Sequence, residues 1–183
     1  TFGRNINYLR ISVTDRCNLR CIYCMPEEGI PLEPHADMLR YEEIARLVRV
    51  AASLGITRVR LTGGEPLVRL GIADLVRMLA EIPGIEDLSM TTNGTLLSQY
   101  VGELARAGLN RLNISLDTLR PDRFHQMTRR GKLQDVLDGI EAAREAGLTP
   151  IKINSVVVRG MNDDEVADMA RQSLAEGWHV RFI

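Results

Sequence analysis

The chain has 183 residues but only three cysteines, and aromatic residues make up just 4% of it. The three cysteines lie within eight residues of one another, and such an odd, crowded set does not suit a disulfide framework. No apolar run is long enough to cross a bilayer, and the polar residues 1–5 do not resemble the start of a signal peptide. These shortages predict a cytoplasmic protein with no membrane partner.

An excess of charge of either sign is also missing, since 23 Lys and Arg face 24 Asp and Glu and leave a formal charge of −1. This balance argues against a nucleic-acid partner and against a polybasic membrane patch. With 45% hydrophobic and 26% charged residues, the composition is that of one globular domain over 1–183. A domain of this length buries about two thirds of its unfolded surface, so its core needs no metal for stability. Any bound metal is therefore expected to serve function.

A glycine followed by an apolar residue recurs along the chain and divides it into similar units. Because glycine accepts the left-handed conformation that closes a helix, each pair predicts a helix C-terminus. Segments with helical periodicity precede the pairs, and short alternating segments follow them, which predicts right-handed parallel crossovers and an α/β fold. Asn162 and Glu165 have the spacing of a capping box at the start of the last helix. The glycine pairs are 55–56, 84–85, 108–109, 147–148 and 177–178.

The predicted strands alternate polar and apolar residues, whereas parallel strands buried on both faces are usually apolar throughout. One face of the sheet is therefore expected to be polar and either to meet water or to enclose a polar ligand. Six such strands predict a partial (β/α)6 TIM-like barrel with helices outside and a polar lumen; an open sheet docked on a further domain is the alternative. The predicted strands are 8–13, 58–62, 88–93, 111–117, 151–154 and 180–182.

The two chain ends suggest a fragment. Ile183 falls inside the sixth predicted strand, which is left without a covering helix. The chain begins without methionine, so either the parent protein continues upstream or its N-terminus is processed.

Cys17, Cys21 and Cys24 form a Cys-x3-Cys-x2-Cys motif directly after the first predicted strand, at the rim where parallel α/β folds place their sites. Three thiolates can hold three irons of a [4Fe-4S] cluster and leave the fourth iron open to a small molecule. This vacancy indicates catalysis rather than electron transfer. The alternative is a zinc site that His35 completes.

The cysteine motif together with Gly63-Gly64-Glu65-Pro66 resembles the radical S-adenosylmethionine (SAM) enzymes. The resemblance implies a (β/α)6 partial barrel, a [4Fe-4S] cluster whose open iron binds SAM, and a 5′-deoxyadenosyl radical that abstracts a substrate hydrogen. It also implies that the two glycines approach the methionine part of SAM and that Glu65 accepts from its ammonium. An ordinary strand-to-helix turn is the alternative for this segment. Further SAM contacts are implied for Ser115, Asn154 and Tyr23, each of which could equally fill the lumen.

Longer strings resemble one family of radical SAM enzymes, the GTP 3′,8-cyclases of molybdenum cofactor biosynthesis. The resemblance implies a GTP substrate whose ribose 3′ hydrogen is abstracted before the carbon joins C8 of guanine. It assigns GTP contacts to Arg10, Arg60, Thr91 and Lys152, and a catalytic place near the reacting centre to Arg181. The polar face of the predicted sheet independently carries the four cationic residues among these, Arg10, Arg60, Lys152 and Arg181. They suit an anionic ligand, and the alternative is that some of them form internal ion pairs with Glu65 or Asp117. The strings are Gly3-Arg4, residues 8–18, 24–26, 60–67, 91–94, 113–117, 152–154 and 180–183.

The resemblance is incomplete in one respect, since the cyclases carry a C-terminal region with three more cysteines that bind an auxiliary cluster, and this chain has no further cysteine. A methionine that contacts SAM is also expected after the sixth strand. Full turnover by this chain alone is therefore not expected. The resemblance also implies that a cytosolic electron donor is a partner and that the parent protein forms a homodimer. Two rivals remain, a peptide-modifying radical SAM maturase with an auxiliary cluster and a zinc-binding module without activity.

Three other residues that often carry chemistry are given structural roles. His125 is expected on a helix surface, His179 at the start of a strand, and Trp178 against a helix end.

Overall fold

A computed structural model describes residue 3 and residues 6–183, and the described chain forms a six-stranded parallel sheet. Arg4 of the Gly3-Arg4 string lies outside the described residues. The strands pair in chain order from β1 to β6, so each helical connection moves the chain one position along the sheet. All six predicted strands are confirmed, with ends that differ by no more than two residues. The strands are β1 (Tyr8–Ser12), β2 (Arg58–Thr62), β3 (Asp87–Thr92), β4 (Arg111–Ser115), β5 (Lys152–Ser155) and β6 (His179–Phe182).

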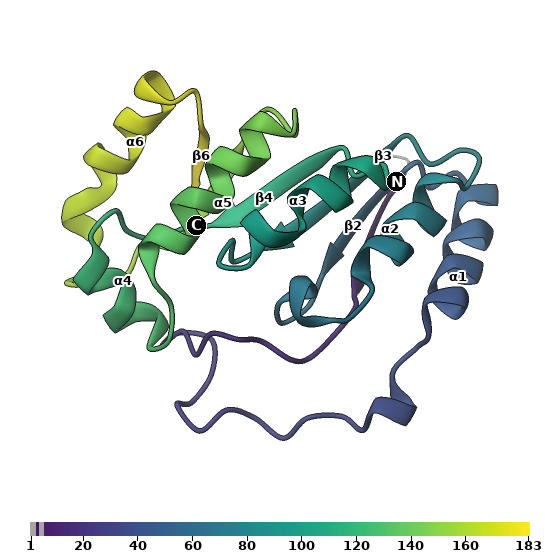
Figure 1. Cartoon of the computed structure of the whole chain (residues 1–183), viewed down its shortest axis with the longest axis horizontal. Coiled ribbons are helices and arrows are strands. Elements are labelled where there is room, and N and C mark those ends of the chain that lie inside the picture. The colour runs from purple at the N-terminus through teal and green to yellow at the C-terminus, as the bar shows by residue number, and fades with distance from the viewer. Residues whose placement is uncertain (1–2, 4–5) are drawn as a thin grey trace.

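Helices α1, α2, α3, α5 and α6 follow one another around the sheet in chain order, whereas α4 lies below α5 and α6 in Figure 1. The long connection from β1 to α1 runs along the lower edge of the figure. This arrangement confirms the predicted α/β partial barrel with helices outside the strands. The α-helices are α1 (Tyr41–Ser53), α2 (Ile72–Ala80), α3 (Leu97–Arg106), α4 (Pro121–Thr128), α5 (Leu133–Glu145) and α6 (Val166–Ala175). Three short 3-10 helices are η1 (His35–Asp37), η2 (Pro66–Val68) and η3 (Asp163–Glu165).

The glycines predicted to end helices all have positive φ angles, between 68° and 100°. After α1, α3 and α5 the apolar residue that follows the glycine donates its N–H back to the last helical turn, as in Leu109 to Leu104 O at 3.0 Å. Gly84 is the exception in position, because α2 already ends at Ala80 and the glycine shapes the turn that follows.

The predicted capping box at Asn162 and Glu165 is wrong. Asn162 is buried, and its side-chain oxygen accepts from Val158 N at 2.7 Å, while its amide donates to the carbonyls of Asp117 and Val156. Glu165 instead accepts from Thr118 Oγ1 at 2.7 Å. Both side chains therefore tie the connection after β5 to the end of β4, and these tertiary bonds replace the local cap.

The apolar side chains of the alternating strands form the core against the helices. Val59, Leu61, Met90, Ile114 and Ile153 are each fully buried. Removing such a side chain costs about 2–5 kcal/mol, so the strand–helix interface fixes the register of the sheet. The residues between them point to the opposite face, which is where the polar side chains collect.

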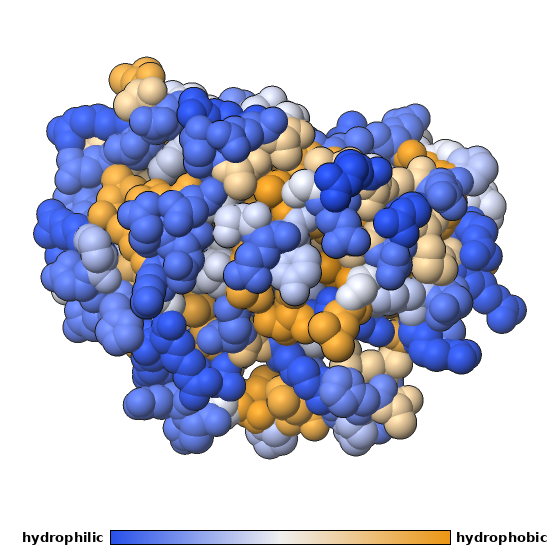
Figure 2. All heavy atoms as spheres, in the orientation of Figure 1, coloured by the Kyte–Doolittle hydropathy of each residue, from blue (hydrophilic) through white to orange (hydrophobic). Residues whose placement is uncertain are grey.

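The outer face over the helices is mainly hydrophilic, with apolar atoms visible between the helices (Figure 2). None of the described helices combines the length and the apolar character that crossing a membrane requires.

Candidate functional site

The three cysteines lie in the loop that leaves β1, and all are free thiols. Cys17 and Cys21 are partly buried, whereas Cys24 is exposed. Leu19 N donates to Cys17 Sγ at 3.4 Å, and the backbone turns at Cys21, whose carbonyl accepts from Cys24 N at 2.9 Å. This short loop, called here the cysteine loop (residues 17–25), brings the predicted metal ligands to the C-terminal end of β1.

The start of the cysteine loop is attached to the turn after β3. Asn93 Nδ2 donates to Asn18 Oδ1 at 2.8 Å, and Asn18 Nδ2 donates to Thr95 Oγ1 at 2.9 Å. Thr95 in turn donates to Asn93 Oδ1 from both its N–H and its hydroxyl. These bonds fix the amide of Asn93 so that its NH2 group faces Cys17 Sγ at 3.9 Å.

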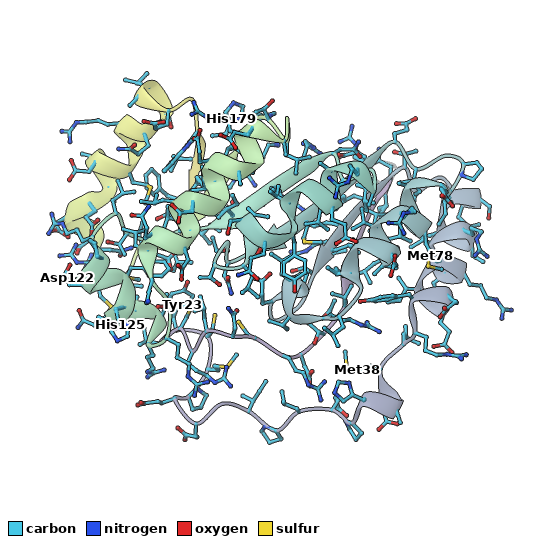
Figure 3. The ribbon with its side chains drawn as sticks, viewed as in Figure 1. Tyr23, Met38, Met78, Asp122, His125 and His179 are labelled. Carbon is cyan, nitrogen blue, oxygen red and sulfur yellow. The ribbon has the colours of Figure 1, made fainter. Side chains whose placement is uncertain are left out.

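The middle of the cysteine loop is attached to the end of β4 through Tyr23. Its hydroxyl donates to Asp117 Oδ2 at 2.5 Å, and Asp117 Oδ1 accepts from Val156 N at 2.9 Å. Burial and the neighbouring Asp117 raise the pKa of Tyr23, and burial raises the pKa of Asp117. Tyr23 lies beside the lower end of α4, on the side of the molecule away from His179 (Figure 3).

The thiols are protonated at neutral pH in the absence of a metal. Burial raises the pKa of Cys17 and of Cys24, and burial together with Cys24 and Asp117 raises the pKa of Cys21 to about 12. Because a metal binds the thiolate, loading the site releases protons.

The donor set fits a [4Fe-4S] cluster better than a single ion. In a cluster each thiolate binds a different iron, so the three sulfurs need not converge on one point. Among residue 3 and residues 6–183, no three His, Cys, Asp or Glu side chains are placed to hold one metal ion. His35 lies in η1 and lines a groove with Arg16 and Arg69 that no cysteine borders. This geometry does not support the zinc alternative.

The two glycines after β2 are required by the chain itself. A Cβ at Gly63, whose φ is 134°, would collide with Thr14 O, and a Cβ at Gly64 would lie 2.6 Å from the carbonyl carbon of Arg16. The backbones meet closely because Gly64 N donates to Thr14 O and Glu65 N to Arg16 O, both at 2.8 Å. The glycine pair thus holds the residues just before Cys17, and its approach to SAM stays a prediction.

Glu65 is fully buried and joins the ends of β2 and β3. Its carboxylate accepts from Thr92 Oγ1 at 2.7 Å, Asn93 N at 2.6 Å and Leu67 N at 3.0 Å. Burial raises its pKa, although the three donors oppose the shift. The structure thus gives Glu65 a positioning role, and its predicted bond to the SAM ammonium stays a prediction.

The sheet register brings the remaining predicted residues together in rows on the polar face. Arg10 pairs with Arg60 across β1 and β2. Thr91 and Lys152 both pair with Asn113, from opposite sides. A third row joins β4, β5 and β6, and its members are Ser115, Asn154 and Arg181. Residues far apart in the chain are therefore neighbours on the polar face because register partners in a sheet share a face.

The cations of this face repel one another. Burial lowers the pKa of Arg60, and Arg10, Arg111 and Arg181 lower it further. Burial also lowers the pKa of Lys152, with added repulsion from Arg111 and Arg181. Such mutual repulsion marks a surface with uncompensated positive charge, which attracts anions.

The alternative of internal ion pairs is wrong for the described chain. Glu65 and Asp117 accept from other groups, and no described carboxylate lies within ion-pair distance of Arg10, Arg60, Lys152 or Arg181. The ion pair on this face joins Arg111 and Asp87, with Arg111 Nε donating to Asp87 Oδ1 at 2.9 Å.

Sequence reasoning missed several residues of the site. The sequence did not single out Asn18, Asn93, Asp117 or the pair of Asp87 and Arg111 as site residues. All of these except Asn18 fall on the alternating polar positions of the strands or just beside them. That alternation was the available signal. The bonding partners carry no local signal, because Tyr23 and Asp117 are 94 residues apart in the chain.

The residues given structural roles behave as predicted. His125 is exposed on α4, His179 begins β6, and Trp178 packs into the core. Trp178 also lines a groove of about 670 Å³ between α5 and α6, but no cysteine and no cation of the polar face borders it. This groove therefore lies apart from the candidate site.

The chain resembles known proteins in sequence over its whole length. It is 60% identical over 183 residues to the GTP 3′,8-cyclase of Moorella thermoacetica and 61% identical over 182 residues to that of Heliobacterium modesticaldum. Each match covers 100% of this chain but 57% and 56% of the relatives, so the chain spans just over half the length of these curated proteins.

Solved structures share the fold at lower identity. Streptococcus suis SuiB bound to the precursor peptide SuiA superposes with a TM-score of 0.76 at 21% identity, covering 96% of this chain and 39% of that one. The structure of anSMEcpe with bound AdoMet gives 0.74 at 19% identity, covering 96% of this chain and 49% of the other. The model of the Radical SAM superfamily matches residues 11–172, which include the cysteine loop, the glycine turn and the four strands from β2 to β5. The chain belongs to the radical SAM superfamily.

Proposed function

We propose that this chain is the catalytic core of a cytoplasmic GTP 3′,8-cyclase in molybdenum cofactor biosynthesis. The observation that carries the proposal is the uncompensated positive charge of the polar face, which Arg10, Arg60, Lys152 and Arg181 produce on β1, β2, β5 and β6. A nucleoside triphosphate carries the matching negative charge, and the relatives that cover this chain at 60–61% identity are named GTP 3′,8-cyclases. A peptide substrate would not need four unpaired cations.

The cofactor side of the site is proposed as follows. Cys17, Cys21 and Cys24 would hold a [4Fe-4S] cluster whose fourth iron binds SAM. When bound, the cluster and SAM would together supply a 5′-deoxyadenosyl radical that removes the 3′ hydrogen of the GTP ribose, so that the ribose C3′ joins C8 of guanine. The residues proposed to orient SAM are Tyr23, Gly63, Gly64, Glu65, Ser115 and Asn154.

The substrate side uses the cations of the polar face. Arg10, Arg60 and Lys152 would bind phosphate oxygens, the arginines through paired donors and the lysine as a point charge. Thr91, in register beside Asn113, would donate a hydroxyl, and Arg181 would act next to the reacting centre. Arg60, Thr91 and Lys152 are partly buried, so water screens their contacts less, whereas Arg10 and Arg181 are exposed on the two edge strands. The residues thereby hold GTP in one orientation and keep water out.

The rest of the proposed enzyme corresponds to the region of the relatives that this chain does not cover. We place there the auxiliary cluster that contacts guanine. The parent is proposed to be a homodimer that takes electrons from a cytosolic donor.

Three measurements on the chain test the proposal: its iron and sulfide content, its cleavage of SAM, and its binding of nucleotides. After anaerobic reconstitution we expect about four irons and four sulfides per chain, and C17A, C21A or C24A should abolish SAM cleavage to 5′-deoxyadenosine. Calorimetric titration should then rank GTP above GMP and guanosine. The variants R60M and K152M should weaken GTP binding by about 10- to 100-fold, the loss expected for one charge-assisted contact.

The matched control is R144M, which removes an equal charge from α5, where Arg144 pairs with Glu141 on the surface. Equal affinity for GTP and guanosine, or preferred binding of a peptide, would overturn the assignment of the substrate. A loaded cluster that survives in the C21A variant would overturn the assignment of the ligands.

A further inference from the structure

The end of α4 carries an unusual backbone conformation. Arg129 closes this helix with a φ of 62°, and it is the one residue other than glycine with positive φ in residues 3 and 6–183. A side chain makes the left-handed region unfavourable, so the surrounding structure must hold Arg129 there. Its N–H still donates to His125 O at 2.7 Å, which keeps it attached to the helix.

The side chain of Arg129 reaches the cysteine loop. Its Nη1 donates to the carbonyl of Arg20 at 3.0 Å and to the carbonyl of Met25 at 3.1 Å. These two carbonyls lie on either side of Cys21 and Cys24 in the sequence. One guanidinium thus joins both ends of the turn that carries two of the three proposed ligands.

Backbone bonds from the end of α4 add to this attachment. Arg20 N donates to Thr128 O at 3.0 Å, and Ile22 N donates to Met127 O at 2.9 Å. The last carbonyls of a helix have no partner within the helix, so the cysteine loop satisfies them here. Arg129 comes directly after Thr128 and has the left-handed conformation. The chain therefore leaves α4 at Arg129, and the side chain of Arg129 turns toward the same cysteine loop.

The other attachments of the cysteine loop act elsewhere. Asn93 and Thr95 hold its start at Asn18, and Asp117 holds Tyr23. Arg129 is therefore the side chain that bridges the two ends of the 20–25 segment. It is partly buried, and none of the described acidic residues lies within ion-pair distance of it, so its donors serve carbonyl groups.

We propose that Arg129 is a positioning residue for the cluster: by bonding the carbonyls of Arg20 and Met25 it keeps Cys21 and Cys24 at the spacing that the iron atoms require. The inference rests on the proposed cluster. It gives the left-handed arginine a function, since the conformation directs the guanidinium at the loop. A residue that served only to end α4 would be better as glycine.

The decisive variant is R129G, because glycine removes the guanidinium and also removes the backbone strain. Arg130 supplies the matched control, since it is the neighbouring arginine, is exposed, and makes no side-chain hydrogen bond within the described chain. The proposal predicts that R129G keeps a melting temperature close to that of the wild-type chain, because the relief of backbone strain offsets part of the lost bonding. It also predicts that amide hydrogen exchange at residues 21–25 of the cluster-free R129G protein is about tenfold faster, as lost charge-assisted bonds imply. R130G should match the wild type in exchange.

The loaded proteins give the second readout. R129G should lose iron to a ferrous chelator on the order of tenfold faster than wild type and R130G, and its reduced cluster should give an altered EPR spectrum. Unchanged exchange at 21–25 together with unchanged iron loss would overturn the role of Arg129. A wild-type chain that binds no iron would instead overturn the proposed cluster, and the exchange of the cluster-free protein would still report whether Arg129 holds the loop.

Discussion

Replacing Gly64 with alanine tests how closely the end of β2 must approach the residues before Cys17. The new Cβ would lie 2.6 Å from the carbonyl carbon of Arg16 and 2.9 Å from Asp15 O. These are backbone atoms, so relief requires the two segments to separate. Separation would break the bonds from Gly64 N to Thr14 O and from Glu65 N to Arg16 O, both 2.8 Å long.

The magnitude follows from these contacts. Two hydrogen bonds contribute about 0.5–1.5 kcal/mol each, and overpacking costs about 1–3 kcal/mol. Gly64→Ala should therefore lower the free energy of unfolding by about 2–6 kcal/mol. For a chain of this size each kcal/mol shifts Tm by about 2–4 °C, so the loss is large enough to measure by circular dichroism.

Gly102→Ala is the matched control for this substitution. Gly102 is exposed within α3, and its added Cβ would meet only the flexible end of Arg106, at 3.7 Å. Alanine at this helical position should raise stability by about 0.5–1 kcal/mol. A Gly64→Ala protein with the stability of the wild type would refute the close backbone approach.

Three further predictions concern other parts of the molecule. Burial and neighbouring cations lower the pKa of Lys152 from 10.5, so in the window just below that value the unfolded chain binds more protons at this group and its contribution to stability rises with pH. In urea titrations the stability of the wild type relative to Lys152→Met should therefore rise across this window, because both proteins share the opposite contribution of the three thiols and Tyr23. Asp87→Asn should lower the free energy of unfolding by about 1.5–3 kcal/mol, because it removes the charged partner of Arg111. The same variant should bind GTP more tightly in calorimetry, because it removes a negative charge from the polar face. Weaker binding would contradict the electrostatic argument. Asn162→Ala should lower the free energy of unfolding by about 1–3 kcal/mol in chemical denaturation, because Val158 N and the carbonyls of Asp117 and Val156 lose their partner. If Asn162 acted only as a helix cap, the loss would be confined to α6.

The fold was predictable because its signals are local. Alternation in segments such as residues 58–62 marks a strand with one buried face, and a glycine such as Gly108 marks the end of a helix wherever the helix packs. The order of strands then follows, since short crossovers place successive strands side by side. The spacing of Cys17, Cys21 and Cys24 likewise places all three in one loop, because the chain between them is too short for a helix or a strand to intervene.

Local patterns in the chain are therefore enough to specify the set of elements, the polar face and the group of cysteines. Folding of the whole chain, in contrast, determined what holds the cysteines: Tyr23 bonds a residue 94 positions away, and Met25 bonds Arg129, 104 positions away. It also decided that Glu165 serves Thr118 rather than its own helix end, and that Gly64 packs on Arg16. The physical reason is that periodicity and capping act within a few residues, whereas these partners meet only after the apolar core has closed and set the distance between the loops.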